Sequence, residues 1–271
     1  RQEVLDSRGS LYVEVKFARE ALPLIEAFSG NLAMVGLPCH VDILRRRMRR
    51  DPETRSKIKG TIALVCGHSS QTRLIDGVTG QLEDEQGAAL TGYHFRHGHW
   101  RGRLAAKFAN GAEVEHPFSR FSVYQNLYFW SEKKCFQCTD HFGYRADISA
   151  GDVWSMNLKN DPVKHTCILV RTEDGEKLYR DAVESSAVAE RALDIKEVLD
   201  GQARTAPFHY NLTARLKAAA RYRLKLKDTV HEKVHWNHRL VAEMAMFNWA
   251  WSQHPKFGKL VFKVPRPILK A

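Results

Sequence analysis

The chain has 271 residues, 44% of them hydrophobic, which is enough to bury the core of one large or two small globular domains. Its formal net charge of +11 arises after residue 200, because residues 201–271 hold 14 Lys or Arg against 3 Asp or Glu. No apolar run reaches the roughly 20 residues that cross a bilayer, and the opening RQEVLDSRGS lacks the apolar centre of a secretory signal. We therefore expect a cytoplasmic protein, at most peripheral to a membrane.

The first third of the chain alternates between strand and helix patterns. LYVEVK (residues 11–16) predicts a strand, and the AREALPLIEAF that follows predicts a helix. The short apolar runs NLAMVG and TIALVC are typical of strands buried on both faces, and HVDILRRRMRR between them predicts a helix. This alternation favours a mainly parallel sheet joined by right-handed crossover helices.

The rest of the chain is less regular. Two alternating segments within residues 90–118 predict an inserted β-hairpin, and FSVYQNLYFW predicts a helix. TCILVR predicts another buried strand, followed by a turn at EDGE and a helical pattern as far as Asp200. From Leu212 onward the sequence predicts one or two basic helices, and the prolines of KVPRPILKA exclude regular helix there. We therefore predict an α/β body of residues 1–200 and a basic helical extension of residues 201–271.

Two cysteines follow predicted buried strands. Cys39 comes directly after NLAMVG at the start of a helix, where Gly36 permits a tight turn and Pro38 fixes the chain. Cys66 ends the run TIALVC. Because cofactors bind at the carboxyl edge of an open parallel sheet, we expect both cysteines to lie where a cofactor can reach them.

Two more cysteines, Cys135 and Cys138, form the pair in KKCFQCTD, a spacing that lets two thiolates reach one metal centre. Without a secretion signal, a disulfide framework is not expected. The residues alone leave open an iron–sulfur cluster, a four-cysteine zinc site, and a structural thiol pair beside two buried cysteines. We favour the cluster, and we interpret Cys167, inside TCILVR, as a core residue.

Several segments resemble, in order, the C-terminal domain of the coenzyme F-420 hydrogenase/dehydrogenase beta-subunit family, which also includes a plant hydroxymethyl-chlorophyll reductase. They span roughly residues 8–185 and are GSLYVEV, VGLPCHVDILRR, LVCGHSS, FRHGHWRG, KCFQCTDHFGYRADISAGDVW and ILVRTEDGEKL. The resemblance implies a flavin–iron–sulfur oxidoreductase, in which FAD lies beside a 4Fe–4S cluster. Electrons would pass between an iron–sulfur partner protein and a small organic acceptor or donor.

Carried over residue by residue, the resemblance implies two sets of site residues. The cluster ligands would be Cys39, Cys66, Cys135 and Cys138. The flavin neighbours would be Ser10, Tyr12, Gly36, Pro38, Gly151 and Asp152. His40 stands where the family usually has Gln, so hydrogen bonding there is expected to differ. The family's glycine-containing FAD segment would precede the first residue of this chain.

Other polar features are interpreted structurally. Asp147 lies in ADISAGDVW and taken alone predicts a turn residue. The arginine run within RRRMRR (residues 45–50) predicts a solvated helical face. In the basic extension, Trp236, Trp249 and Trp251 are expected to pack on their own domain, or to dock an acidic protein or an anionic membrane surface ahead of nucleic acid.

Three functional hypotheses follow. The first is the iron–sulfur flavoprotein oxidoreductase or electron-transfer subunit that the resemblance implies. The alternative is a zinc-stabilised binding module for nucleic acid or an acidic protein. The third is a cluster-bearing protein without flavin that acts structurally. A deazaflavin, a ferredoxin partner and a pigment- or polysaccharide-related substrate all stay open as electron acceptors.

Overall fold

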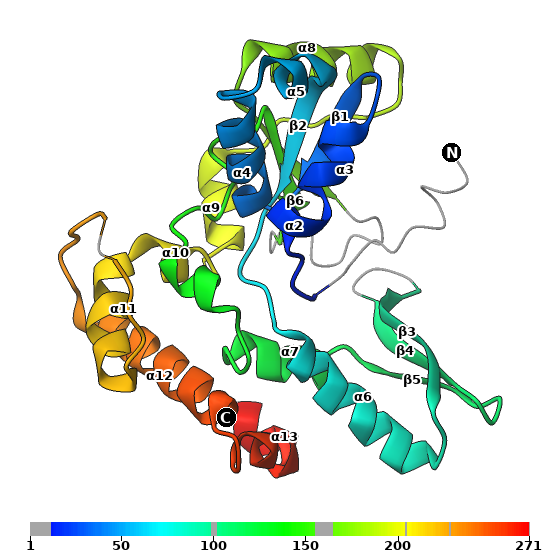
Figure 1. Cartoon of the computed structure of the whole chain (residues 1–271), viewed down its shortest axis with the longest axis vertical. Coiled ribbons are helices and arrows are strands. Elements are labelled where there is room, and N and C mark those ends of the chain that lie inside the picture. The colour runs from blue at the N-terminus through cyan, green and yellow to red at the C-terminus, as the bar shows by residue number, and fades with distance from the viewer. Residues whose placement is uncertain (1–11, 99–101, 155–164, 204, 228, 271) are drawn as a thin grey trace. The chain divides into compact units, whose positions relative to one another are not determined.

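The computed structural model describes residues 12–98, 102–154, 165–203, 205–227 and 229–270 (Figure 1). The chain folds into two compact units, each assembled from separate stretches of sequence. Unit 1 comprises the described residues within Arg1–Glu14, His68–Gln137 and Leu212–Ala271, and unit 2 those within Val15–Gly67 and Cys138–Asn211. The units do not follow the predicted boundary at residue 200, which stays a prediction about the division of function.

Unit 2 is built on a four-stranded sheet with the order β1-β2-β6-β7. The parallel neighbours are β1 (Leu32–Gly36), β2 (Ile58–Leu64) and β6 (Ile148–Asp152), and β7 (Thr166–Val170) pairs antiparallel with β6 at the edge. The apolar runs that predicted strands are β1, β2 and β7. The predicted α/β fold with a mainly parallel sheet is therefore confirmed.

Helices cover both faces of this sheet. The helices of unit 2 are α2 (Phe17–Glu20), α3 (Leu22–Ala27), α4 (Pro38–Met48), α5 (Pro52–Lys57), α8 (Glu173–Glu184), α9 (Ile195–Gly201) and α10 (Ala206–Tyr210). The Thr61 hydroxyl of β2 contacts Arg45 of α4, whereas a Cβ on the preceding Gly60 would lie 3.5 Å from Leu178 of α8. Because successive strand residues point to opposite faces, α4 and α8 pack on opposite sides.

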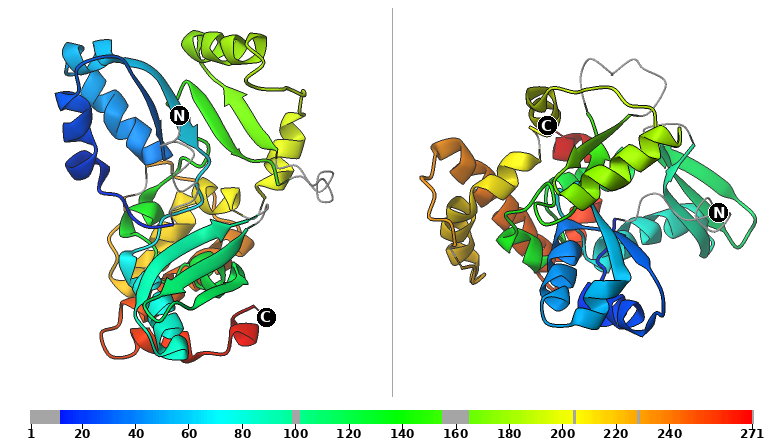
Figure 2. Two further views of the ribbon diagram at one scale, coloured as in Figure 1. Left: turned by 90° about the vertical axis from the view of Figure 1, so that its right-hand side faces the viewer. Right: turned by 90° about the horizontal axis from the view of Figure 1, so that it is seen from above.

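Unit 1 contains a three-stranded antiparallel sheet with the order β3-β4-β5, visible in the left view of Figure 2. Its elements are β3 (Leu90–His97), β4 (Arg103–Phe108), β5 (Glu113–Pro117), α6 (Thr72–Gln86), α7 (Ser119–Asn126), η1 (Lys133–Gln137), α11 (Leu212–Ala219), η3 (Ala220–Tyr222), α12 (Trp236–Gln253), η4 (Gly258–Lys263) and α13 (Arg266–Lys270). The core of unit 1 includes Leu74, Val78 and Leu82, which recur every four residues on α6 and are fully buried. The predicted hairpin is confirmed as β3 and β4, and β5 extends it.

Some element predictions are wrong in detail. The described part of the first predicted strand, residues 12–16, is not a strand, and Leu11 lies outside the described residues. The EDGE segment is the first turn of α8 rather than a free turn, because the Thr172 hydroxyl caps the helix by accepting from the Gly175 N–H at 3.1 Å. The helical pattern toward Asp200 is interrupted between α8 and α9.

The proline-rich tail also differs from its prediction. KVPRPILKA was expected to contain no regular helix, yet Arg266–Lys270 form the short helix α13. Proline is tolerated in the first turn of a helix, because the N–H it lacks would have no partner inside the helix there. Pro267 is the second residue of α13, so it does not interrupt the helix.

Candidate functional site

Two of the predicted ligands share one edge of the sheet in unit 2. In the parallel pair of β1 and β2, Gly36 lies opposite Ala63. Cys39 lies three positions after Gly36, and Cys66 lies three positions after Ala63, so both cysteines lie beyond the carboxyl ends of adjacent strands. Both side chains are partly buried. This placement is the one that the sequence predicted, at the edge where open α/β sheets bind cofactors.

The turn that carries Cys39 is tightly packed. A Cβ on Gly36 would lie 3.3 Å from the His40 Cβ, so this position favours glycine. The Leu37 N–H donates to His40 Nδ1 at 3.4 Å, and the His40 ring stacks on Phe17 at a centroid distance of 4.9 Å. His40 therefore braces the loop that leads into α4.

Cys66 is held through its backbone by His141. The Cys66 N–H donates to the His141 carbonyl at 3.0 Å, and His141 Nδ1 lies 2.8 Å from the Cys66 carbonyl oxygen. His141 Nε2 lies 3.1 Å from the Gln202 side-chain oxygen, and the Gln202 amide donates to the Asp152 carbonyl at 2.9 Å. Burial lowers the pKa of His141, and its bonds to Cys66 and Gln202 oppose this.

Cys138 lies on the chain segment that also carries His141. Cys138 lies three residues before His141, and its Sγ lies 3.5 Å from the Asp140 carbonyl oxygen. The Asp140 carboxylate in turn accepts from the Gly143 N–H, which closes the loop after the cysteine. Cys39, Cys66 and Cys138 thus all belong to unit 2, and the first two follow the carboxyl ends of adjacent parallel strands.

Cys135, the fourth predicted ligand, belongs to unit 1. It lies in η1, and its Sγ accepts a hydrogen bond from the Ser69 N–H at 3.3 Å. Its carbonyl oxygen accepts from the guanidinium of Arg215, which is 1% exposed. A backbone hydrogen bond to the sulfur and a buried guanidinium on the carbonyl fix the Cys135 side chain and backbone in place.

Among the described residues, no group of three or more His, Cys, Asp or Glu side chains is arranged to hold a metal ion. The four-cysteine ligand set therefore stays a prediction. Cys167 lies on β7, is 6% exposed and belongs to an apolar cluster of unit 2. Burial raises the pKa of its thiol, which makes it a poor thiolate donor.

The predicted flavin neighbours are distributed over both units. Ser10 lies outside the described residues. Tyr12, in unit 1, packs its ring against Phe95 and Phe118. In unit 2, Pro38 is buried at the start of α4.

The glycine–aspartate pair of the predicted flavin site ends β6. A Cβ on Gly151 would lie 2.7 Å from the side chain of Val65, the residue after β2, so β6 needs glycine to approach the chain there. Asp152 follows it as the last residue of β6.

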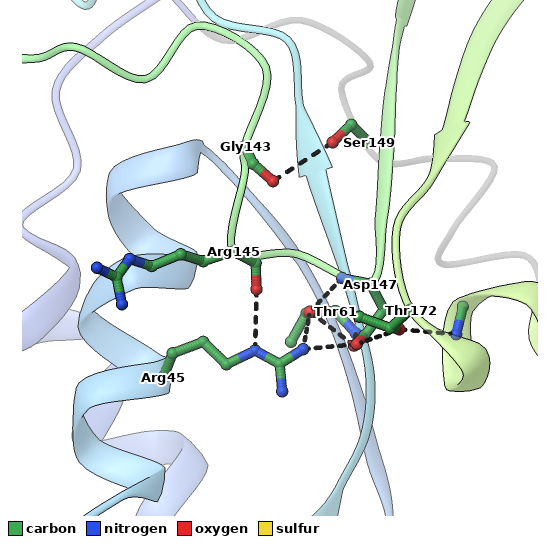
Figure 3. Close-up of polar contacts among 8 residues, drawn as sticks. Arg45, Thr61, Gly143, Arg145, Asp147, Ser149 and Thr172 are labelled. Atoms are coloured by element: carbon green, nitrogen blue, oxygen red, sulfur yellow. Dashed lines mark hydrogen bonds and ion pairs between the residues drawn. The ribbon is translucent and has the colours of Figure 1, made fainter.

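Asp147 has a role that the sequence did not indicate. Its carboxylate accepts from the Arg45 guanidinium at 2.6 Å, from the N–H and hydroxyl of Thr61 at 2.8 Å each, and from the Thr172 hydroxyl at 2.8 Å (Figure 3). Burial raises its pKa, but these bonds and the charge of Arg45 outweigh burial and hold the pKa below its usual value. Asp147 therefore joins α4, β2 and the start of α8 and is not a simple turn residue.

The arginine run of α4 is only partly a solvated face. Arg45 bonds Asp147, Arg46 pairs with Asp42 at 2.8 Å, and Arg47 pairs with Glu26 at 2.6 Å. The exposed Arg49 and Arg50 fit the prediction. The run therefore combines structural ion pairs with a short solvated end.

Comparisons with known proteins agree with these observations. Residues 29–196, more than half of the chain, match the family model that describes the C terminus of the beta subunit of coenzyme F420 hydrogenase/dehydrogenase. The chain belongs to this family. Its fold is similar to that of a chain in a xenon derivative of the F420-reducing NiFe hydrogenase complex from Methanosarcina barkeri. The TM-score is 0.53 at 15% identity, over 84% of this chain and 76% of that one. No curated protein matched the sequence.

The family identifies the chain as a redox protein of the hydrogenase/dehydrogenase beta-subunit type, with an oxidoreductase role. Members of the family typically carry iron–sulfur clusters. In the part of the chain that the structure describes, no helix is both long and apolar enough to cross a membrane. The predicted resemblance is therefore confirmed at the level of the family.

Proposed function

We propose that the protein is an iron–sulfur flavoprotein that passes electrons between an iron–sulfur partner protein and a small organic molecule. One observation carries the proposal: in a member of this redox family, Cys39 and Cys66 follow paired positions of adjacent parallel strands at the cofactor-binding edge. When bound, the cluster supplies one-electron transfer and FAD couples it to two-electron chemistry.

The donor chemistry fits a 4Fe–4S cluster with Cys39, Cys66, Cys135 and Cys138 as ligands, because four thiolates complete such a cluster. The surrounding protein would tune it in two ways. The Ser69 N–H would donate to the ligand sulfur of Cys135, which raises the reduction potential relative to an unbonded sulfur. His141 would fix the backbone of Cys66 from both sides.

FAD enters the proposal through the family. We propose Ser10, Tyr12, Gly36, Pro38, Gly151 and Asp152 as its neighbours. A side chain at Gly36 or Gly151 would meet neighbouring atoms, so glycine at both positions lets chain segments at the edge of the sheet approach one another closely. The hydrogenase complex that shares the fold contains several subunits, which supports a partner protein as the source or acceptor of electrons.

Metal and sulfide analysis of anaerobically purified protein tests the cluster. We expect about four irons and four sulfides per chain, and FAD among the cofactors released by denaturation. Serine substitutions at Cys39, Cys66, Cys135 and Cys138 should each remove most of the iron. Cys167→Ala is the matched control, because Cys167 is a buried thiol of unit 2 and should leave the iron content unchanged.

Other results would overturn specific parts of the proposal. Stoichiometric zinc without sulfide would replace the cluster with the zinc-stabilised binding module. Full iron and sulfide without any flavin would support the cluster and remove FAD. Iron loss in Cys167→Ala equal to that in the other variants would show that the ligand set is wrong.

A further inference from the structure

Helix α12 of unit 1 is apolar on two sides. Its inner side includes Ala242, Ala245 and Met246, which are at most 2% exposed. A second apolar set is Trp236, Leu240, Met244 and Phe247, with exposed fractions of 80%, 63%, 40% and 52%. Spacings of four, four and three residues place these four side chains in one stripe along the helix. A helix with two apolar sides is expected to be covered on both.

Hydrogen bonds fix which side of α12 faces inward. Asn248 Nδ2 donates to the Leu127 carbonyl at 3.0 Å, and Ser252 Oγ accepts from the Trp130 N–H at 2.9 Å. Asn248 and Ser252 are both buried, so the helix cannot rotate without breaking these bonds. The apolar stripe is therefore held outward, away from the core of unit 1.

Basic side chains flank the stripe at both ends of α12. Exposed Lys and Arg residues are Arg221, Arg223, Lys225, Lys227 and Lys233 before the helix, and Lys256, Lys259, Lys263 and Arg266 after it. The described acidic residues of this region are already engaged: Glu232 accepts from the Leu212 N–H, and Glu243 pairs with Arg221 and Arg239. The flanks of the stripe therefore carry a strong net positive charge.

Further apolar side chains continue beyond the end of α12. Phe257, Leu260 and Ile268 are 53%, 42% and 66% exposed, and they alternate with the basic residues of η4 and α13. Exposed aromatic and aliphatic groups interleaved with Lys and Arg are typical of segments that lie in a membrane interface. Such segments bury their apolar groups among lipids while the cations meet anionic headgroups.

We propose that the stripe Trp236, Leu240, Met244 and Phe247, with its basic flanks, docks unit 1 on an anionic lipid surface. Helix α12, orange in Figure 1, would lie along that surface without crossing it. A second copy of the chain fits poorly, because pairing two such faces would bring like charges together. A lipid surface supplies an apolar layer and diffuse negative charge at once, and it requires no matching ion pairs from this face.

Vesicle flotation with the full chain tests the proposal. We expect the protein to float with equimolar phosphatidylcholine and phosphatidylglycerol vesicles and not with phosphatidylcholine alone. Binding should fall steeply as salt is added, because exposed charges are screened over about 8 Å at physiological ionic strength. Tryptophan emission should shift to shorter wavelength on binding, since Trp236 is 80% exposed in the unbound protein.

Two pairs of double variants separate the apolar from the charged contribution. Trp236→Ser with Phe247→Ser should abolish binding, whereas Leu24→Ser with Ile195→Ser, at exposed apolar positions of unit 2, should not. Lys256→Glu with Lys259→Glu should weaken binding at least tenfold, because each lost basic residue costs roughly fivefold. Arg49→Glu with Arg50→Glu changes the net charge equally and should have a much smaller effect.

Three results would overturn the proposal. The first is an absence of binding to the anionic vesicles. The second is binding that the Trp236 and Phe247 substitutions leave unchanged. The third is a protein interface in place of the lipid contact. In that case the Trp236 and Phe247 substitutions would abolish a concentration-dependent dimer, or the capture of an acidic protein, while vesicle binding persists.

Discussion

Replacing Arg45 with Met should destabilise unit 2 far more than the same change at the neighbouring Arg46. The Arg45 guanidinium donates to the Asp147 carboxylate at 2.6 Å and to the Thr61 hydroxyl at 3.1 Å. Arg46 makes an ion pair of similar length, 2.8 Å, with Asp42. The two pairs differ in burial and in the further hydrogen bonds that Arg45 donates to Thr61 and to the Arg145 carbonyl, so comparing them measures what the buried network contributes.

The expected magnitudes follow from that difference. The Asp147 side chain is 7% exposed. Among the described contacts, Arg45 is the only cation beside the Asp147 carboxylate, so Arg45→Met would leave that buried negative charge unpaired. Breaking a fully buried pair costs about 3–5 kcal/mol. Because Arg45 itself is 26% exposed, we expect about 2–3 kcal/mol. Arg46 is 64% exposed, and an exposed i,i+4 pair contributes only about 0.3–0.5 kcal/mol.

The effect should also depend on pH. Burial alone would raise the pKa of Asp147, but hydrogen bonds from Thr61 and Thr172 and the charge of Arg45 lower it below the unfolded value. The carboxylate therefore stabilises the fold above about pH 4, and this stabilisation is lost as the pH falls through the folded pKa. Urea unfolding of both variants at neutral and acid pH measures this. Equal losses in the two variants, or a gap that persists after Asp147 is protonated, would refute the reasoning.

Two further predictions concern unit 1. On α6, Gly77→Ala should destabilise the protein, because a Cβ there would clash with the Phe262 ring. Gly80→Ala should stabilise it by about 0.5–1 kcal/mol, because a Cβ at Gly80 would have no other described atom within 4 Å beyond the local helix backbone. Thermal unfolding measures both effects, and equal effects would contradict the packing of η4 on α6. Burial and the charge of Arg120 lower the pKa of His116, so the free energy of unfolding should fall as the pH drops below about 6.5. His116→Gln should reduce that fall in unfolding experiments. Identical pH profiles for the two proteins would show that His116 does not contribute to the pH dependence.

The sequence predicted the elements whose signal is local. Continuous apolar runs identified β1, β2 and β7, because strands buried on both faces need apolar side chains throughout. β5 escaped prediction because EVEHP is short, half-exposed and ends in proline. β6 escaped because ISAGD has little strand propensity, and its place depends on the close approach of Gly151 to Val65.

Long-range contacts explain what else could not be predicted. The division into two units depends on pairs such as Trp130 and Phe262, whose rings stack at 4.6 Å across a long stretch of sequence. In the candidate site, cysteine spacing and strand order indicated the proposed ligands. His141 gave no comparable signal, because its partners are the Cys66 backbone, 75 residues away, and the Gln202 side chain, 61 residues away.

All predicted ligands precede residue 200 and the net positive charge follows it, so the sequence predicts that the basic extension is separable from the chemistry. The contacts of unit 1 argue against this. Trp249 of α12 packs on Phe136, the residue after Cys135, at a centroid distance of 5.9 Å. The preceding backbone has positive φ at Tyr128 and Trp130, 64° and 50°, a conformation that costs on the order of 1–3 kcal/mol at each residue. Ser252 of α12 accepts from the Trp130 N–H and helps to hold it.

Trp249→Ala should therefore disturb the Cys135 segment without changing a proposed ligand. Phe136 is fully buried, so loss of the indole against it should cost about 2–4 kcal/mol of stability and speed the release of iron to a chelator. Trp236→Ala is the matched control on the same helix, because Trp236 is 80% exposed and its removal should change stability by less than about 0.5 kcal/mol. Unfolding curves test the packing independently of the cluster. If Trp249→Ala retains both its stability and its iron as Trp236→Ala does, the helices only adjoin the cysteine segment, and the extension is separable as the sequence suggested.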